Sequence, residues 1–136
     1  MIVVSFTGVR KLEELWRTPK PIEAAQNDGD NALVDEWYEY QFEWDASKAQ
    51  RNARDHKVTF EEAAEVFADA NALSLFDTEH SNGEDRWITL GIDQAGRLLV
   101  VCHTFQELSE TRARVRIFSA RRTTKGERRS YQKHDL

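Results

Sequence analysis

Apolar and polar residues alternate in several short runs of the chain, which is the period of a half-buried β-strand. These runs cover residues 40–44, 72–76, 86–92, 97–105 and 112–118. The fourth run has an unbroken apolar centre, which predicts a central strand buried on both faces. A short polar turn ending in Gly separates the third and fourth runs and predicts a hairpin between them.

Helical spacing replaces this alternation between the first two runs. Asp45 is suited to cap a helix over about 46–56, and a capping box at 59–62 (TFEE) predicts a second helix over about 60–68. The apolar residues of the second helix recur at a spacing that predicts packing against a core. A further capping-box pattern at 124–127 predicts a short C-terminal helix.

The order of elements is therefore β-α-α-β-β-β-β-α, which indicates an α+β fold. We expect two N-terminal helices packed on an antiparallel sheet of four to five strands, followed by the C-terminal helix. Residues 1–40 differ from this body, because a strand signal at 2–6 and one or two helical turns at 12–16 precede two prolines and a polar turn. We interpret 1–40 as an N-terminal extension and 41–136 as the domain.

Composition narrows the class of protein. With 136 residues, 40% of them hydrophobic, the chain is long enough for one compact domain. It has no apolar run of transmembrane length and no secretory-signal pattern at its start, and Cys102 is its only cysteine. These features favour a cytoplasmic protein without disulfides, membrane spans or a metal site.

The net charge of −5 conceals an uneven distribution along the chain. Residues 1–40 carry a net charge of −4, residues 41–111 carry −8 and residues 112–136 carry +7. A ligand responds to the local field rather than to the total charge. The C-terminal end can therefore present a basic face to an anionic partner despite the acidic body.

Three arginines, Arg112, Arg114 and Arg116, alternate with apolar residues in the last predicted strand, so they share one face. Neighbouring guanidinium groups are then about 7 Å apart, close to the phosphate repeat of a nucleic-acid strand. The alternative is a solvated strand face that is kept charged against edge pairing. Further cations follow, which turn the row into a patch and favour an anionic partner such as RNA: Arg121, Arg122, Lys125, Arg128 and Arg129.

Few residues are candidates for proton transfer. His103, in the apolar strand, is either a general acid or base or a strand residue hydrogen-bonded to a neighbour. Tyr131, near the basic cluster, is either a proton donor, a stacking platform or an anchor for the last helix. No histidine pair has the spacing of a zinc site, and no phosphate loop or nucleophile elbow is present, so NTPase, serine hydrolase and zinc chemistry are disfavoured.

Lys48, Asn52 and His56 share one face of the first predicted helix. They belong to a set of motifs in a fixed order: FEWD at 42–45, VTFEEA at 58–63, EDRW at 84–87, GRLLVV at 96–101 and RIFSARR at 116–122, followed by Glu127 and Tyr131. This ordered set resembles the BrnT toxin family over about residues 41–136. Each motif is weak alone, but their combination is specific.

The resemblance implies a RelE-like fold and the toxin of a bacterial type II toxin-antitoxin system. It implies a small ribonuclease that uses neither a metal nor another cofactor and that arrests translation. The implied partners are an RNA substrate and a BrnA-like ribbon-helix-helix antitoxin. Toxin and antitoxin would form a heterotetramer that contacts DNA only through the antitoxin, with no role at a membrane.

In such a ribonuclease the 2′-OH of the substrate attacks the adjacent phosphate, and cations stabilise the charge that develops. The expected phosphate clamps are Arg116 and Arg121, with Arg86 assisting. His103 or Tyr131 would move the protons, and Tyr131 would act as a base only if nearby arginines lowered its pKa.

Two departures from the family pattern leave a second function open. Lys57 stands where the family has a glycine after the first helix, and residues 1–40 precede the usual start. The alternative is a catalytically inactive, toxin-like module that binds RNA or a partner protein. In that case the six acidic residues within 23–39 would lie across the basic face in cis. A misplaced start codon would instead mean that the extension is never made.

Overall fold

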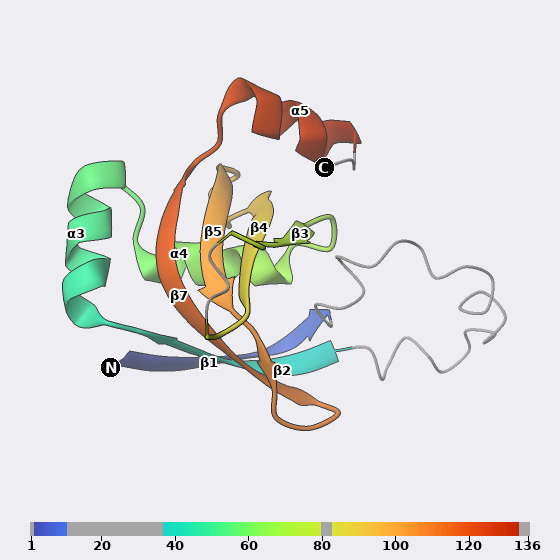
Figure 1. The fold of residues 1–136 in the computed structure, drawn as a ribbon. Coiled ribbons are helices and arrows are strands. Elements are labelled where there is room, and N and C mark those ends of the chain that lie inside the picture. The colour runs from blue at the N-terminus through green and yellow to red at the C-terminus, as the bar shows by residue number, and fades with distance from the viewer. Residues whose placement is uncertain (1, 11–36, 80–82, 134–136) are drawn as a thin grey trace, which may run out of the picture.

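The computed structural model describes residues 2–10, 37–79 and 83–133, which form a seven-stranded mixed sheet with helices (Figure 1). The strands are β1 (Ile2–Arg10), β2 (Trp37–Trp44), β3 (Leu73–Phe76), β4 (Arg86–Ile92), β5 (Leu98–Thr104), β6 (Gln106–Glu107) and β7 (Arg112–Arg122). The helices are α3 (Ala46–His56), α4 (Phe60–Glu65) and α5 (Lys125–Lys133), with a 3-10 turn, η2 (Val66–Ala68), after α4. The strand order is β1-β2-β7-β5-β4-β3, and β6 pairs with β7.

The helices and strands expected between residues 40 and 133 are present, with ends that differ by a few residues. The direction of one strand is not as expected, because β2 pairs in parallel with β7. The prediction of an antiparallel sheet is therefore wrong. The parallel register places Tyr40 beside Ala113 and Phe42 beside Val115, and all four side chains are completely buried in one core.

Part of the segment predicted as an extension belongs to the sheet. β1 pairs antiparallel with β2, from Ile2 opposite Trp44 to Arg10 opposite Trp37. The strand expected at 2–6 lies within β1, whereas the helical turns expected at 12–16 lie outside the described residues. A truncation that preserves β2 must therefore keep the chain from Trp37 onward.

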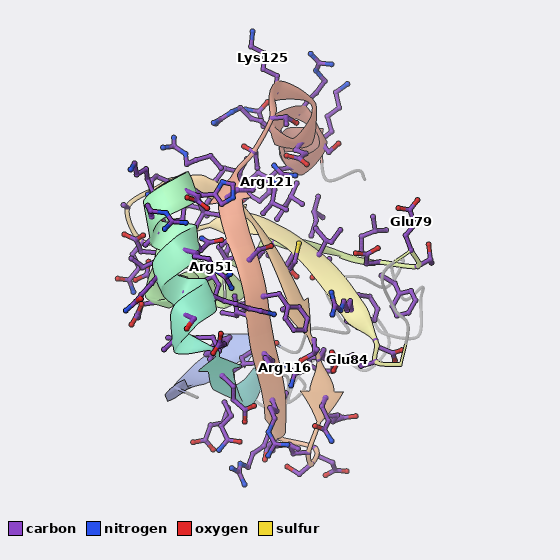
Figure 2. The ribbon with its side chains drawn as sticks, turned by 60° about the vertical axis from the view of Figure 1, so that its left-hand side comes forward. Arg51, Glu79, Glu84, Arg116, Arg121 and Lys125 are labelled. Carbon is purple, nitrogen blue, oxygen red and sulfur yellow. The ribbon has the colours of Figure 1, made fainter. Side chains whose placement is uncertain are left out.

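The two faces of the sheet have different characters. α3 and α4 contact β7 on one face, where an aromatic core lies. The Phe67 ring lies 5.4 Å from the Tyr40 ring and 5.2 Å from the Phe42 ring, both in tilted or edge geometry. The other face of β7 carries arginines, and Figure 2 shows Arg116 and Arg121 along that strand with α5 beyond its end.

Asn52 joins α3 to the part of β7 that β2 leaves unpaired. β2 pairs with β7 only as far as Arg116. Beyond that point the Asn52 amide binds both backbone groups of Ala120, with distances of 3.0 Å from Ala120 N to Oδ1 and 2.8 Å from Nδ2 to Ala120 O. Nδ2 also donates to the carbonyl of Val58 at 2.9 Å. The buried Asn52 thus satisfies strand groups that would otherwise lose their partners.

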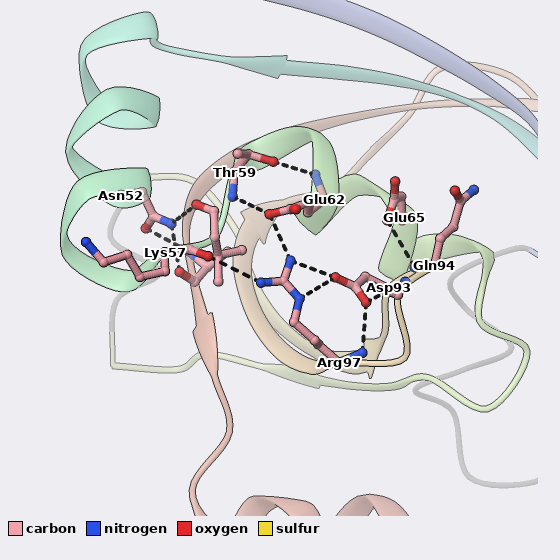
Figure 3. Close-up of polar contacts among 11 residues, drawn as sticks. Asn52, Lys57, Thr59, Glu62, Glu65, Asp93, Gln94 and Arg97 are labelled. Carbon is pink, nitrogen blue, oxygen red and sulfur yellow. Dashed lines mark hydrogen bonds and ion pairs between the residues drawn. The ribbon is translucent and has the colours of Figure 1, made fainter.

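Arg97 fastens the β4–β5 hairpin to the turn between α3 and α4 (Figure 3). Its guanidinium forms ion pairs with Asp93 and Glu62, both at 2.8 Å, and donates to the carbonyl oxygen of Lys57 at 3.2 Å. The cap hydrogen bond from Thr59 N–H and the contact with Arg97 hold the pKa of Glu62 below its usual value. The network fixes the end of α3 in place, together with the unusual backbone at Lys57.

Lys57 adopts the left-handed conformation, with φ 59° and ψ 33°, at the C-terminal end of α3. Its N–H donates to the carbonyl of Ala53, which closes the helix as a glycine normally does. A side chain in this region costs of order 1 kcal/mol, because Cβ lies too near the backbone. The family's glycine would avoid that cost.

We therefore expect Lys57→Gly to raise the free energy of unfolding by about 1 kcal/mol and the melting temperature by about 4 °C. Thermal unfolding followed by circular dichroism measures this. Lys57→Ala is the matched control, because it also removes the hydrogen bond from Nζ to the carbonyl of Arg54 but keeps Cβ. A glycine variant no more stable than the alanine variant would contradict the assignment of strain.

Candidate functional site

The predicted arginine row exists on β7, but its charges are matched by carboxylates. Arg112 lies 3.8 Å from Glu39, and Arg114 lies 3.0 Å from Glu43. Both glutamates belong to β2, whose parallel pairing places them on the same face as the arginines. The row is therefore a set of partly exposed ion pairs rather than an uncompensated positive stripe.

Arg116, the third member of the row, belongs to a cluster formed by two separate parts of the chain. Its guanidinium lies 2.6 Å from the carboxylate of Glu84, and the guanidinium of Arg86 lies 3.9 Å from the other oxygen of the same group. Figure 2 shows Arg116 and Glu84 directed toward one another. All three side chains are 37–40% exposed, so solvent or a ligand can reach them.

Phe118 is the fourth member of this cluster. The guanidinium carbon of Arg86 lies 4.3 Å from the centroid of the ring, and that of Arg116 lies 5.3 Å away. Sequence reasoning assigned no role to Phe118, and it left Glu84 either to position a charged group or to form a local ion pair with its neighbours. The contact of Glu84 with Arg116 depends on the tertiary fold, because it joins β7 to the loop before β4.

Arg121 binds a different carboxylate. Its two terminal nitrogens lie 2.9 and 2.8 Å from the two oxygens of Glu127, a bidentate pair. This pair and the cap hydrogen bond from Thr124 lower the pKa of Glu127 to about 2. Arg121 follows Arg116 by five residues on β7, a separation of about 16 Å, so the two predicted clamps would contact different phosphates.

His103 lies on the other face of the sheet and is completely buried. Its Nδ1 donates to the carbonyl of Thr104 at 2.8 Å, and its Nε2 lies 2.7 Å from the hydroxyl of Thr89, which contacts Ser74. Burial lowers the pKa of His103 to about 4. The position matches the predicted alternative of a hydrogen-bonded strand residue and leaves His103 no access to a ligand at Arg116.

Tyr131 on α5 donates its hydroxyl hydrogen to Asp69 Oδ2 at 2.6 Å. Burial and this hydrogen bond raise its pKa above the usual value, the opposite of what a tyrosine base requires. The contact ties α5 to the turn that follows η2, as expected for a helix anchor. Neither of the two predicted proton-transfer residues therefore faces the Arg116 cluster.

Other predicted RNA-binding cations are not paired with a carboxylate among the described residues 37–79 and 83–133. Those on β7 and α5 are exposed: Arg122, Lys125, Arg128 and Arg129. The helix-face residues Lys48 and His56 are also exposed, whereas Asn52, the third member of that face, is the buried connection to β7.

The fold and the site together define a small α+β domain that carries guanidinium groups and an aromatic ring beside one another on one face of its sheet. Residues 44–127 match the family described as "Ribonuclease toxin, BrnT, of type II toxin-antitoxin system", and the chain belongs to this family. The match confirms the resemblance found in the sequence. The members of the family are toxins that pair with an antitoxin and act on RNA.

No curated protein matches the chain. The family match begins at the last residue of β2, so β1 and nearly all of β2 lie outside it.

Of the helices that the structure describes, none has the length and apolar character needed to cross a membrane. Within the same residues, no three His, Cys, Asp or Glu side chains gather as a metal site would require.

Proposed function

We propose that this chain is an active, RelE-like endoribonuclease toxin that cleaves RNA without a metal and arrests translation in the cytoplasm. A BrnA-like ribbon-helix-helix antitoxin would hold it in a heterotetramer and would make any contact with DNA. Membership of the family supports the general activity. The observation that carries the specific proposal is the exposed Glu84 carboxylate beside Arg116 and Arg86.

In the proposed reaction the scissile phosphate lies beside Arg116 and Arg86 and takes the place of Glu84 on the Arg116 guanidinium. Glu84 accepts the proton of the substrate 2′-OH, and the 2′-oxygen forms a bond to phosphorus. The bond from phosphorus to the 5′-oxygen breaks, and the leaving oxygen takes a proton from water. The two guanidinium groups stabilise the negative charge on the phosphate oxygens in the transition state.

The remaining cations would hold the RNA on either side of this centre. Arg121 would contact a second phosphate about 16 Å along β7, in competition with Glu127. The row arginines Arg112 and Arg114 would extend the path in the other direction. The exposed cations at the end of the sheet would add nonspecific attraction: Arg122, Lys125, Arg128 and Arg129.

The test is cleavage of a labelled RNA by the purified full-length chain, with and without EDTA. We expect EDTA to leave the rate unchanged and the products to carry a 2′,3′-cyclic phosphate and a free 5′-OH. An otherwise identical DNA strand is the control and must stay intact. Products with a 5′-phosphate would contradict the mechanism, whereas RNA that binds but is never cut would favour the inactive binding module.

A further inference from the structure

A shallow groove runs between α3 and β7, beside the proposed active centre. Lys48, Arg51 and His56 of α3 contribute to its walls, and Phe118 of β7 lies within it. Figure 2 shows Arg51 on α3, next to β7. The proposed cleavage chemistry uses neither this groove nor the α3 cations.

The groove is positively charged, unlike the arginine row. Lys48 and Arg51 form no ion pair with any carboxylate in the part of the chain that the structure describes. Asp55, the acidic residue of the groove, is 2.9 Å from Arg54 and also interacts electrostatically with Arg51, so its charge is shared between a cation outside the groove and one inside it. An anion that binds in the groove therefore does not have to displace a glutamate from Lys48 or Arg51, as it would from the arginines of the row.

A bulge in β7 places Phe118 between the groove and the proposed active centre. On β5, Cys102 pairs with Ser119 and His103 with Ile117, so Phe118 is the extra residue of the bulge and has no partner. Its ring contacts Arg116 on the side of the active centre and Lys48 on the side of the groove. Both cationic groups lie 5.3 Å from the ring centroid, so they are separated by at most twice that distance.

We propose that this groove binds the nucleotide next to the cleaved phosphate. Its base stacks on Phe118, and the next phosphate contacts Lys48 and Arg51. The inference rests on the proposed ribonuclease function and adds a subsite to it. A single-stranded RNA fits better than an acidic peptide, because the groove offers an aromatic face on which a base can stack together with cations that can contact a phosphate.

The test separates binding from cleavage by using a fluorescent 2′-O-methyl oligoribonucleotide, which has no 2′-OH to attack and cannot be cut by the proposed route. Affinity is measured by anisotropy at several salt concentrations. We expect the double variant Lys48→Ala/Arg51→Ala to bind at least about tenfold more weakly, with a log–log salt slope smaller by about 1.4. Phe118→Leu should weaken binding by about fivefold or more without changing the slope.

Lys133→Ala is the control, because it removes one exposed cation at the end of α5, outside the groove. It should bind the oligonucleotide as the unaltered chain does, and circular dichroism must show that all variants are folded. The proposal is overturned if the double variant keeps the affinity and salt slope of Lys133→Ala. It is also overturned if the double variant loses affinity only for a polyglutamate peptide, which would assign the groove to an acidic protein partner.

The two proposals fail in different ways. If the unaltered chain cuts RNA but the groove variants bind like the control, only the groove assignment is lost. If the unaltered chain binds the oligonucleotide through the groove but cuts no RNA, the cleavage proposal is lost and the groove remains.

Discussion

Replacing Arg116 by alanine should lower the rate of RNA cleavage by about 10²–10³-fold while leaving the protein folded. That loss is typical when one group that stabilises transition-state charge is removed from an active site. Arg116 is the guanidinium closest to Glu84, at 2.6 Å, and it also lies beside Phe118. Without it, the scissile phosphate would keep only Arg86 as a cationic neighbour.

The fold should tolerate this change. The Arg116 side chain is 37% exposed, and ion pairs of this exposure contribute little to stability. The backbone N–H of Arg116 donates to the Thr104 hydroxyl at 3.0 Å, and that bond does not depend on the side chain. We therefore expect the free energy of unfolding to change by less than about 1 kcal/mol.

Kinetics of RNA cleavage and growth arrest on induced expression are the two measurements. Lys133→Ala is the control, because Lys133 is an exposed cation at the end of α5 that belongs neither to the cluster nor to the proposed RNA path. Arg116→Lys keeps the charge but not the planar fork, so it should recover only part of the activity. Cleavage by Arg116→Ala within threefold of the unaltered chain would remove Arg116 from the mechanism.

The elements of the fold were predictable because their signals are local. Capping boxes, helical spacing and strand alternation all act within a few residues, and both the box at Thr59 and the box at Thr124 form as predicted. The parallel pairing of β2 with β7 was not predictable in this way. The direction of this pairing depends on contacts between buried side chains of β2 and β7, and these residues are more than seventy positions apart in the sequence.

The difference between local signals and long-range contacts also explains which parts of the site could be predicted. The alternation on β7 predicted which arginines share a face, but not that Glu39, Glu43 and Glu84 would compensate them. His103 carried a local signal that pointed to burial: it lies in an apolar strand that was predicted to be buried on both faces, and Leu98 to Val101 are all buried. The apolar run in β5 was thus better evidence for His103 than its chemical type.

Burial of His103 predicts a loss of stability in mild acid. The pKa of His103 is about 4 in the folded chain and close to its ordinary value of 6.5 when the chain unfolds. Between pH 6.5 and pH 4 the His103 side chain is therefore protonated in the unfolded state but neutral in the folded state. The free energy of unfolding should decrease as the pH falls from 6.5 toward 4, by about 2 kcal/mol between pH 7 and pH 5.

The surroundings of His103 give the physical reason for this expected pH dependence. In the neutral ring Nδ1 donates to the Thr104 carbonyl and Nε2 accepts from Thr89, so both nitrogens are satisfied without a charge. The carboxylates with lowered pKa, Glu62 and Glu127, also lose stabilising interactions in acid. They titrate mainly below pH 5, so the interval from pH 7 to pH 5 reports chiefly on His103.

Urea unfolding at pH 7, 6 and 5 measures the effect. His103→Asn should be less stable than the unaltered chain at pH 7, because the smaller side chain leaves a cavity beside Phe67, but its stability should no longer decrease toward pH 5. His56→Gln is the control, because His56 is exposed and should leave the decrease intact. If the decrease persists in His103→Asn, another group controls the acid sensitivity, and His103 is not held neutral by the core.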